Sequence, residues 1–321
     1  MKLQKLVVSC GGTGGHFYPG LSIAREFQAK YGEVLLLLSG SHAVEQSRIA
    51  GESGIEAVAL PEMPHYRKNP FRFVSGFLGG YSAAKKHLKE FAPQAMLGMG
   101  SFATLPVVLA AKSCHIPLFL HDGNARVGKA NRKFSKWAEF AGTAFPAVNA
   151  DKCRCEVLET GMPLRPELLD FAGLEKSAAI EALNKEFDMD FAADLPVIVI
   201  TGGSQGAAVF NQVLPEALKR CSGKFQVIHL CGKGKAADAE RAMPERDLLI
   251  CCVKRPAKWP RSWRRLIWYS AVPGGVRRRN CPFSECRRCW YPILMPQKGI
   301  RWIMPVILRN MAGRSWWKIS S

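Results

Sequence analysis

The sequence lacks any long hydrophobic run, since no stretch of eighteen or more apolar residues occurs among its 321 residues. A membrane-spanning helix needs about twenty such residues, so a spanning helix is excluded. Acidic residues are scarce in one part of the chain only. Residues 251–321 contain 16 Lys and Arg and a single acidic residue, Glu285, whereas residues 1–250 contain 29 basic and 25 acidic residues. The formal net charge of +19 therefore comes mostly from the C-terminal segment.

Tryptophan is almost absent from residues 1–250, which contain only Trp137, while the segment 251–321 contains the other seven and five of the 11 cysteines. The chain thus combines two compositions. A basic, tryptophan-rich arm can bind nucleic acid, but charge confined to one segment does not favour that function, and we expect no nucleic-acid partner. The apolar stretch before Cys10 is too short for a secretory signal, so we expect a cytoplasmic protein with reduced thiols.

Residues 6–27 have the pattern of a strand, a glycine-rich loop and a helix. The run Leu6–Ser9 leads into Gly11–Gly15, four of whose five residues are glycine. The apolar positions of the helix that follows are Leu21, Ile23, Ala24 and Phe27. Backbone N–H groups and the helix dipole favour an anion at such a helix N-terminus. His16 lies at the mouth of this loop, where a base could meet a ligand.

The rest of residues 1–150 alternates strand and helix patterns, which is typical of a parallel sheet covered on both faces. The expected strands are Lys5–Ser9, Val34–Leu38, Ala95–Gly98, Leu118–His121 and Phe140–Thr143, and the expected helices include Gly20–Tyr31 and Ser82–Phe91. The polar, helical segment Pro163–Asp194 is interpreted as an interdomain connection. A second strand and glycine loop then follow at Pro196–Gly206, with a helix over Ala207–Arg220 and a strand over Phe225–Cys231. Two doubly wound domains would place their glycine loops across a shared cleft.

Five blocks carry a resemblance to a known family. They are Gly11–His16, Met99–Pro106, His121–Arg132, Gly161–Arg165 and Gly202–Ala207. In this order they resemble glycosyltransferase family 28, the family of MurG-type transferases, over about residues 3–250. The resemblance implies an α/β protein of the GT-B fold, in which two Rossmann-like doubly wound domains face a cleft and the second is here incomplete. The expected divisions are an acceptor and membrane-side domain at 1–162, the start of a UDP-sugar domain at 163–250, and an anomalous tail at 251–321.

The resemblance also implies an activity. Members of this kind transfer N-acetylglucosamine from UDP-N-acetylglucosamine to undecaprenyl-diphosphate-linked MurNAc-pentapeptide, with inversion, in peptidoglycan synthesis. No cofactor and no metal are implied. The protein would lie peripherally on the cytoplasmic side of the bacterial inner membrane. Two departures from the family pattern are Met162, where Asn is usual, and Asp122-Gly123, where Glu-Gln is common.

The resemblance assigns roles in the first domain. His16 is the candidate base for the attacking hydroxyl, because its ordinary pKa near 6.5 suits neutral pH; the alternative is that it only orients the loop or binds substrate. Thr13, Gly14 and Gly15 would offer N–H groups and a hydroxyl to substrate, or simply form a tight turn. Asn124 would reach sugar hydroxyls or an acetamido group, or form an Asx turn.

Three further residues are assigned to the nucleotide side. Arg165 would be a fixed cation for phosphate, with a structural ion pair as the alternative. Ser204 and Gln205 belong to the second glycine loop and would bind the donor, although Ser204 could instead be a helix N-cap.

Other signals in the sequence have plainer interpretations. Asp188-Met-Asp190 has the Asp-x-Asp spacing of metal-dependent transferases, but it precedes a strand, and we expect solvated carboxylates. Cys153-x-Cys155 lacks partners for zinc and is expected to be two ordinary thiols. His65–Val74 interleaves basic and aromatic residues and continues into Phe77-Leu78. It indicates an interfacial patch on an anionic membrane, with an ordinary loop and amphipathic helix as the alternative.

The tail lacks the segments that the family has next, namely an Arg-Ala-Gly turn, a ribose-binding Glu and a Gly-His-Gln…Asn-Ala segment. Synonymous codons for Gln297–Pro305, read from the third base of the first codon, permit E-G-H-Q-M-D-N-A. The same offset permits D-L-V-x-C-R-A-G-G from Leu266–Gly275 and L-S-x-F-G-V-P from Asn280–Pro292. Family motifs in family order favour the hypothesis that the tail is translated out of frame, with the break around residues 240–255.

The same sequence is compatible with functions other than active transfer. The literal chain could be an inactive remnant that keeps only acceptor binding, because the donor site depends on the lost tail. A different GT-B enzyme or a nucleotide-sugar epimerase is a third possibility, and the His121–Asn131 block argues against the epimerase. The tail cysteines Cys281, Cys286 and Cys289 imitate iron–sulfur or zinc spacing, but they lack a convincing fourth ligand. Out-of-frame sequence has no selected apolar periodicity, so we expect it to pack poorly.

Overall fold

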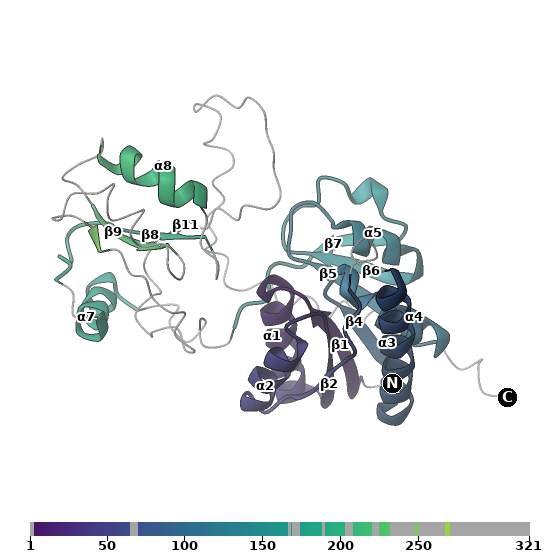
Figure 1. Ribbon diagram of the computed structural model, residues 1–321. Helices are drawn as coiled ribbons and strands as arrows, with labels where there is room; N and C mark the ends of the chain where they lie inside the picture. The colour runs from purple at the N-terminus through teal and green to yellow at the C-terminus, as the bar shows by residue number, and fades with distance from the viewer. Residues whose placement is uncertain are drawn as a thin grey trace. The chain divides into compact units, whose positions relative to one another are not determined.

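The computed structural model describes residues 3–64, 70–165, 168, 174–187, 190–202, 208–219, 225–231, 248–249 and 267–269 (Figure 1). The described residues form two compact units, the first containing residues 3–165 and the second residues 168–269. Each unit is an α/β structure with its own parallel sheet. No described helix has the length and apolar character needed to cross a membrane.

The first unit contains a seven-stranded parallel sheet in the order β3-β2-β1-β4-β5-β6-β7. Its strands are β1 (Lys5–Gly11), β2 (Glu33–Ser39), β3 (Glu56–Ala59), β4 (Ala95–Gly98), β5 (Leu118–Asp122), β6 (Ala138–Thr143) and β7 (Glu156–Glu159). The five strands expected from the sequence are confirmed to within two residues at each end. The sequence does not predict the edge strands β3 and β7, because each has only four residues, begins with a glutamate and is partly exposed. Such strands show no buried apolar run.

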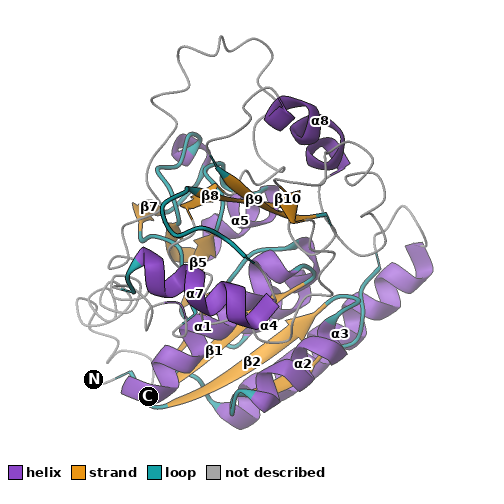
Figure 2. Cartoon of the chain, turned by 90° about the vertical axis from the view of Figure 1, so that its left-hand side faces the viewer, coloured by secondary structure: helices purple, strands orange, loops and turns teal. Residues whose placement is uncertain are grey.

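Helices cover both faces of this sheet (Figure 2). They are α1 (Gly14–Lys30), α2 (Ala43–Glu52), α3 (Pro70–Phe91), α4 (Leu105–Ser113) and α5 (Lys129–Phe134), with short 3₁₀ turns η1 (Phe102–Thr104), η2 (Ser135–Trp137) and η3 (Ala150–Lys152). The helix expected over Ser82–Phe91 in fact begins at Pro70, because proline is well tolerated in a first helical turn. The sequence does not predict the first half of α3 because several of its apolar side chains are exposed, so they do not form a buried helical face.

The core of the first unit consists of two apolar layers, one on each side of the sheet. Val8, Leu36 and Leu97 pack with α1 and α2, whereas Val7, Leu35 and Met96 pack with α3 and α4. Neighbouring residues along a strand point to opposite faces, so the middle of these strands is apolar on both faces, as is typical of strands buried on both sides. This explains why the runs Leu6–Ser9 and Val34–Leu38 were easy to identify in the sequence.

The second unit has a smaller parallel sheet in the order β10-β9-β8-β11. Its described elements are α7 (Lys176–Phe187), β8 (Val197–Thr201), α8 (Ala208–Lys219), β9 (Gln226–Leu230), β10 (Leu248–Leu249) and β11 (Ile267–Tyr269). The interpretation of Pro163–Asp194 as a connection is wrong for α7. Ile180 and Leu183 of this helix are buried against Val197, Val199 and Ile228, so α7 belongs to the core of the second unit.

Strand β11 lies within the anomalous segment 251–321, where we expected poor packing. Its backbone pairs in parallel with β8, and Ile267, Trp268 and Tyr269 lie opposite Ile198, Val199 and Ile200. β-Branched and aromatic residues favour strands, and three of them in a row do so whichever reading frame produced them. These three residues therefore form a strand, while the expectation of poor packing stays a prediction, because the burial of their side chains and the rest of the segment lie outside what the structure describes.

Both sheets contain a point at which the strand order reverses. In the first unit β1 lies between β2 and β4, and in the second unit β8 lies between β9 and β11. In open α/β sheets, ligands bind outside the carboxyl ends of the strands at such a point. The glycine loop after β1 lies at the switch point of the first unit.

We expect Gly11→Ala to destabilise the chain and Gly51→Ala to leave it unchanged or slightly more stable. Gly11 has φ +138°, and a Cβ there would lie 2.1 Å from the carbonyl oxygen of Ser39, whereas a Cβ on Gly51 in α2 meets nothing within 4 Å. The first change should lower the free energy of unfolding by roughly 2–3 kcal/mol, and the second should raise it by up to about 1 kcal/mol. Urea unfolding of both variants measures this, and equal midpoints would contradict it.

Candidate active site at the carboxyl edge of the first sheet

The glycine segment is partly strand and partly helix. Gly11 ends β1, Thr13 is the extended residue before the helix, and α1 begins at Gly14. Gly14, Gly15 and His16, which the sequence placed in or at the mouth of a loop, therefore form the first helical turn. The His16 amide donates to the carbonyl oxygen of Thr13 at 3.1 Å. In the described part of the chain the amides of Gly14 and Gly15 have no hydrogen-bond partner, so they can meet an anion as predicted.

His16 projects from this turn and is held on one side. Its Nδ1 atom lies 3.2 Å from Oγ1 of Thr13. If Nδ1–H donates to the threonine oxygen, Nε2 carries a lone pair and can accept a proton from a substrate hydroxyl. If the threonine hydroxyl donates to Nδ1, Nε2 carries the hydrogen and acts as a donor. The base role therefore requires the Nδ1–H tautomer, with the Thr13 hydroxyl oxygen as the acceptor.

The charge of His16 is set by two opposing effects. Burial lowers its pKa from the ordinary value, and the nearby carboxylate of Asp122 acts in the opposite direction with a smaller effect. The net result is a lowered pKa, so the imidazole is neutral at pH 7, as a general base must be before reaction. The imidazolium that forms after proton transfer is stabilised by the same carboxylate.

Asp122 at the end of β5 is the centre of a hydrogen-bond network. Its Oδ1 accepts from the amide and from Nδ2 of Asn124, at 3.1 and 2.9 Å. Its Oδ2 accepts from the Gly128 amide at 2.8 Å and from Nδ2 of Asn131 at 3.0 Å. The bond from the Asn124 amide closes an Asx turn whose side chain is that of Asp122, which is a different turn from the one that Asn124 could form with its own side chain. The side chain of Asn124 is nevertheless exposed and available to a ligand.

The loop after β4 reaches the same edge and is strained. Gly100 and Ser101 both have positive φ, +88° and +81°, and Ser101 Oγ accepts from the Ala103 amide. A Cβ on Gly12 would lie 3.2 Å from Ser101 Oγ, and a Cβ on Gly100 would lie 3.0 Å from Nδ2 of Asn131. Strained backbone of this kind is concentrated at functional sites. The loops after β1, β4 and β5 therefore converge at the switch point.

The residues assigned to the nucleotide are described only in part. The guanidinium of Arg165 lies over the ring of Tyr18 of α1, 5.7 Å from its centroid. Arg165 is thus placed beside the glycine helix of the first unit. Ser204 and Gln205 lie outside the described residues, so their assigned roles stay predictions.

Sequence reasoning missed the importance of Asp122 and Asn131. Asp122 was noted only as a departure from the family pattern, and Asn131 as one letter of a motif. The sequence signal was that Asp122 ends an apolar strand and Asn131 lies in the short helix after it. Both side chains are almost fully buried, at 5% and 2% exposed. Buried polar groups of this kind require hydrogen bonds, which here join two loops.

Some of the other signals can be compared with the structure. Burial raises the pKa of Cys155 to about 11 and raises that of Cys153, so both are protonated thiols at neutral pH. Among the described residues no group of three or more His, Cys, Asp or Glu side chains could hold a metal ion. Asp190 is exposed, as expected for a solvated carboxylate, and Asp188 lies outside the described residues. The tail cysteines also lie outside them.

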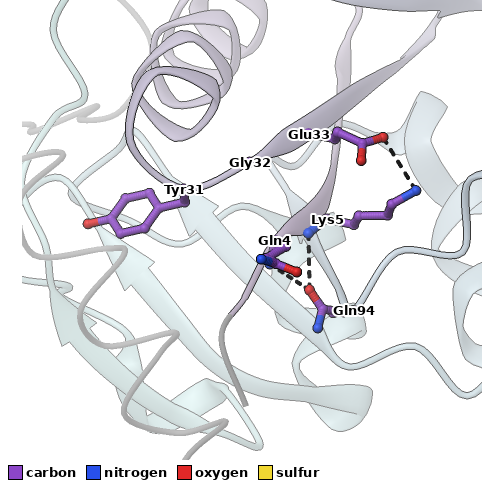
Figure 3. A pocket seen from close by; sticks show the side chains of 6 residues that line it. All are labelled: Gln4, Lys5, Tyr31, Gly32, Glu33 and Gln94. Carbon is purple, nitrogen blue, oxygen red and sulfur yellow. Dashed lines mark hydrogen bonds and ion pairs between the residues drawn. The ribbon is translucent and has the colours of Figure 1, made fainter.

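A pocket of about 430 Å³ lies at the opposite edge of the sheet (Figure 3). It is formed at the amino ends of β1 and β2, where Lys5 pairs with Glu33 at 3.3 Å. Gln94 Oε1 accepts there from the backbone amides of Gln4 and Lys5. Ligands of open parallel sheets bind at the carboxyl ends, so this pocket is not the candidate active site.

The fold and the site define a class of protein: a two-unit α/β chain of the GT-B class. It presents a glycine-led helix N-terminus and a histidine at the switch point of its first sheet. Family models agree with this class. The glycosyltransferase family 28 N-terminal domain matches residues 6–143, and the glycosyltransferase family 28 C-terminal domain matches residues 197–251.

Curated relatives are described as UDP-N-acetylglucosamine--N-acetylmuramyl-(pentapeptide) pyrophosphoryl-undecaprenol N-acetylglucosamine transferases. The protein from Chlamydia pneumoniae is 32% identical over 259 residues, which are 79% of this chain and 67% of the relative. That from Chlamydia muridarum is 35% identical over 68% of this chain and 56% of the relative. The chain belongs to glycosyltransferase family 28. It spans about 56–67% of the length of these relatives.

Solved structures share the fold. MurG from Acinetobacter baumannii has a TM-score of 0.54 at 22% identity and is matched over 76% of this chain and 66% of its own. The UDP-GlcNAc 2-epimerase from Neisseria meningitidis bound to UDP-GlcNAc has a TM-score of 0.56 at 13% identity, over 82% of this chain and 75% of its own. Fold likeness alone does not separate a transferase from an epimerase. The family matches in sequence make that distinction.

We expect the pKa of His16 to lie below its ordinary value near 6.5 and to fall further in Asp122→Asn. Burial disfavours the imidazolium, and removing the carboxylate charge removes the effect that opposes burial. NMR titration of the labelled histidine side chain measures both values in the full chain. Asp151→Asn, which removes an exposed carboxylate of the same unit, is the matched control and should leave the pKa unchanged. A higher His16 pKa in Asp122→Asn would contradict the assignment.

Proposed function

We propose that this family 28 chain corresponds to an inverting transferase. It would move N-acetylglucosamine from UDP-N-acetylglucosamine to undecaprenyl-diphosphate-linked MurNAc-pentapeptide, the reaction that the names of its relatives state. The observation that carries the proposal is the placement of His16 at N3 of a glycine-led helix, at the switch point of the first sheet. Matches to both family 28 domains support it.

The residues of the site would divide the work. His16 takes the proton of the attacking acceptor hydroxyl through Nε2, in the tautomer whose Nδ1–H donates to the Thr13 hydroxyl oxygen. The free amides of Gly14 and Gly15 offer hydrogen bonds to an anionic group. Asn124 presents its side chain to the sugar. Transfer of this kind breaks the bond between the anomeric carbon and the UDP oxygen, and the departing diphosphate takes the electron pair.

The donor half of the reaction depends on the second unit. Arg165, Ser204 and Gln205 are proposed to bind the nucleotide and its phosphates, because a guanidinium suits a diphosphate and the second glycine loop repeats the first. The C-terminal family model stops at residue 251, inside the interval in which we place the frame break. This supports the proposal that residues 251–321 are out of frame and that the literal chain keeps acceptor binding without transfer.

We propose that the protein lies peripherally on the cytoplasmic face of the membrane and docks through α3. Phe71, Val74 and Leu78 lie along one side of this helix and are 86%, 53% and 58% exposed. Phe73 stacks on Phe102 of η1 with centroids 6.2 Å apart, which joins this face to the strained loop after β4. An apolar face of this kind, with Arg72 beside it, fits an anionic lipid surface. Residues 65–69 of the predicted patch lie outside the described residues.

We expect the triple variant F71S/V74S/L78S to weaken binding to phosphatidylglycerol-containing vesicles by about tenfold or more, because three apolar side chains no longer enter the bilayer. Cosedimentation measures this. V44S, which changes a 78% exposed valine on α2, is the matched control and should bind like the original chain. Equal binding by the triple variant would contradict the docking proposal. Binding should also weaken as salt rises, since the anionic contribution is screened.

We expect resequencing of codons 235–321 to reveal an added or missing base between codons 240 and 255. The chain in the restored frame should then transfer N-acetylglucosamine from UDP-N-acetylglucosamine to a soluble acceptor analogue, and His16→Ala should reduce its turnover by roughly 100-fold or more. The literal chain should bind the analogue without transfer. An unchanged DNA frame would contradict the frame proposal, and a restored chain that binds neither substrate would contradict the transferase.

A further inference from the structure

The loop after β5 runs beside the loop after β6 and is hydrogen-bonded to it. The amide of Ala144 donates to the carbonyl oxygen of Asp122, and the amide of Val148 donates to the carbonyl oxygen of Ala125, both at 2.9 Å. These bonds join the residues of the two loops in the same order along the chain. The two loops therefore form one continuous surface at the carboxyl edge of the first sheet.

Asn149 fastens the far end of this surface. Its Oδ1 accepts from the Val127 amide at 2.9 Å, and its Nδ2 donates to the Val127 carbonyl oxygen at 3.2 Å. The side chain of Asn149 is 2% exposed, and buried polar groups of this kind are retained because they satisfy each other. The backbone of both loops is thus fixed before any ligand binds, which lowers the entropy cost of binding there.

The exposed side chains of this surface combine positive charge with apolar groups. Arg126 is exposed, and no ion pair to it occurs in the described part of the chain. Phe145 and Val148 of the neighbouring loop are 41% and 70% exposed. A guanidinium binds a carboxylate through two parallel hydrogen bonds. The surface therefore fits an anion that carries a carboxylate together with apolar groups.

This surface begins beside the proposed catalytic histidine. Asp122, whose carboxylate acts on His16, is bonded to Ala144, the residue before Phe145. Arg126 follows Asp122 by four residues, a separation of at most about 14 Å. An extended pentapeptide spans up to about 17 Å. A peptide attached to a sugar at His16 is therefore long enough to reach Arg126.

The acceptor proposed above carries a pentapeptide on its muramyl group. Muramyl is an acyl group, so it joins the amino end of the peptide, and the other end is a carboxylate that is ionised at neutral pH. We propose that Arg126, Phe145 and Val148 form a subsite for this peptide, in which the Arg126 guanidinium binds the C-terminal carboxylate. This inference rests on the proposed function for the identity of the acceptor. A lipid surface is the less favoured partner, because these residues belong to the loops that lead from Asp122 and not to α3.

The first experiment varies the peptide end and the guanidinium together. The probes are two water-soluble analogues, MurNAc-pentapeptide diphosphate on a short isoprenoid chain, one ending in a carboxylate and the other in a carboxamide. Calorimetry measures their affinity for the full chain. R126Q should weaken binding of the carboxylate analogue by about fivefold and of the carboxamide analogue by less than about twofold, because the carboxamide has no charge to pair with. F145S/V148S should weaken binding of both analogues, since both lose the apolar contact.

K89Q is the matched control, because Lys89 is an exposed lysine in the last turn of α3 and lies outside the two loops. It should leave both affinities unchanged. Equal weakening of both analogues by R126Q would overturn the inference, and so would unchanged binding of the carboxylate analogue. A loss of binding to phosphatidylglycerol vesicles in R126Q, with unchanged analogue binding, would assign Arg126 to the membrane instead.

The second experiment uses no sugar and therefore separates this inference from the proposed function. N-acetyl-alanyl-alanine or its C-terminal amide is added to the full chain, and NMR follows the Nε resonance of Arg126, assigned by its loss in R126Q. The acid should shift this resonance and the amide should not, and added salt should reduce the shift because it screens the charges. If the original chain binds neither acceptor analogue, the proposed function is overturned, whereas a shift by the acid alone still supports a subsite for a peptide carboxylate. An equal response to acid and amide would overturn that subsite.

Discussion

The close backbone approach at the end of β1 is the constraint on which the first unit depends. A Cβ on Gly11 would lie 2.1 Å from the Ser39 carbonyl oxygen, and a Cβ on Gly40 would lie 3.3 Å from Cα of Gly12. The loops after β1 and β2 can therefore meet only because these residues have no side chains. This approach lets α1 start directly at the switch point, with two free amides and His16 in its first turn. The parallel sheet supplies the rigid edge from which that turn projects.

The chemistry of the site follows from how few charges it contains. Burial lowers the pKa of His16 and keeps its imidazole neutral, while the carboxylate of Asp122 opposes this with a smaller effect that raises the pKa. Asp122 itself is held by backbone and side-chain amides, so its negative charge is satisfied without a cation that would cancel its effect on His16. His121, beside it, donates from Nε2 to the Gly161 carbonyl oxygen at 3.0 Å and is buried. Its role is to fasten β5 to the segment after β7.

The two halves of the chain differ in what they can support. The first unit has a complete core on both sides of its sheet and a site whose groups are fixed by buried hydrogen bonds. The second unit has a four-stranded sheet, and its fourth strand, β11, comes from the anomalous segment. Under the proposed change of reading frame, the short apolar strand β11 still pairs with β8.

The sequence alone determined the class of fold, most strands and the location of the site. Continuous apolar runs such as Val34–Leu38 are possible only in strands buried on both faces, and Gly11–His16 has few uses other than a ligand-binding turn. Tertiary structure decided three features that the hydrophobic periodicity of the sequence does not record. The edge strands β3 and β7 exist because a neighbouring strand supplies their hydrogen bonds. The helix α7 belongs to a core formed by strands later in the chain, and the orientation of Asn124 depends on a carboxylate that Gly128 and Asn131 hold in place. Each of these features depends on contacts between residues distant in sequence or on hydrogen-bond direction, neither of which local composition records.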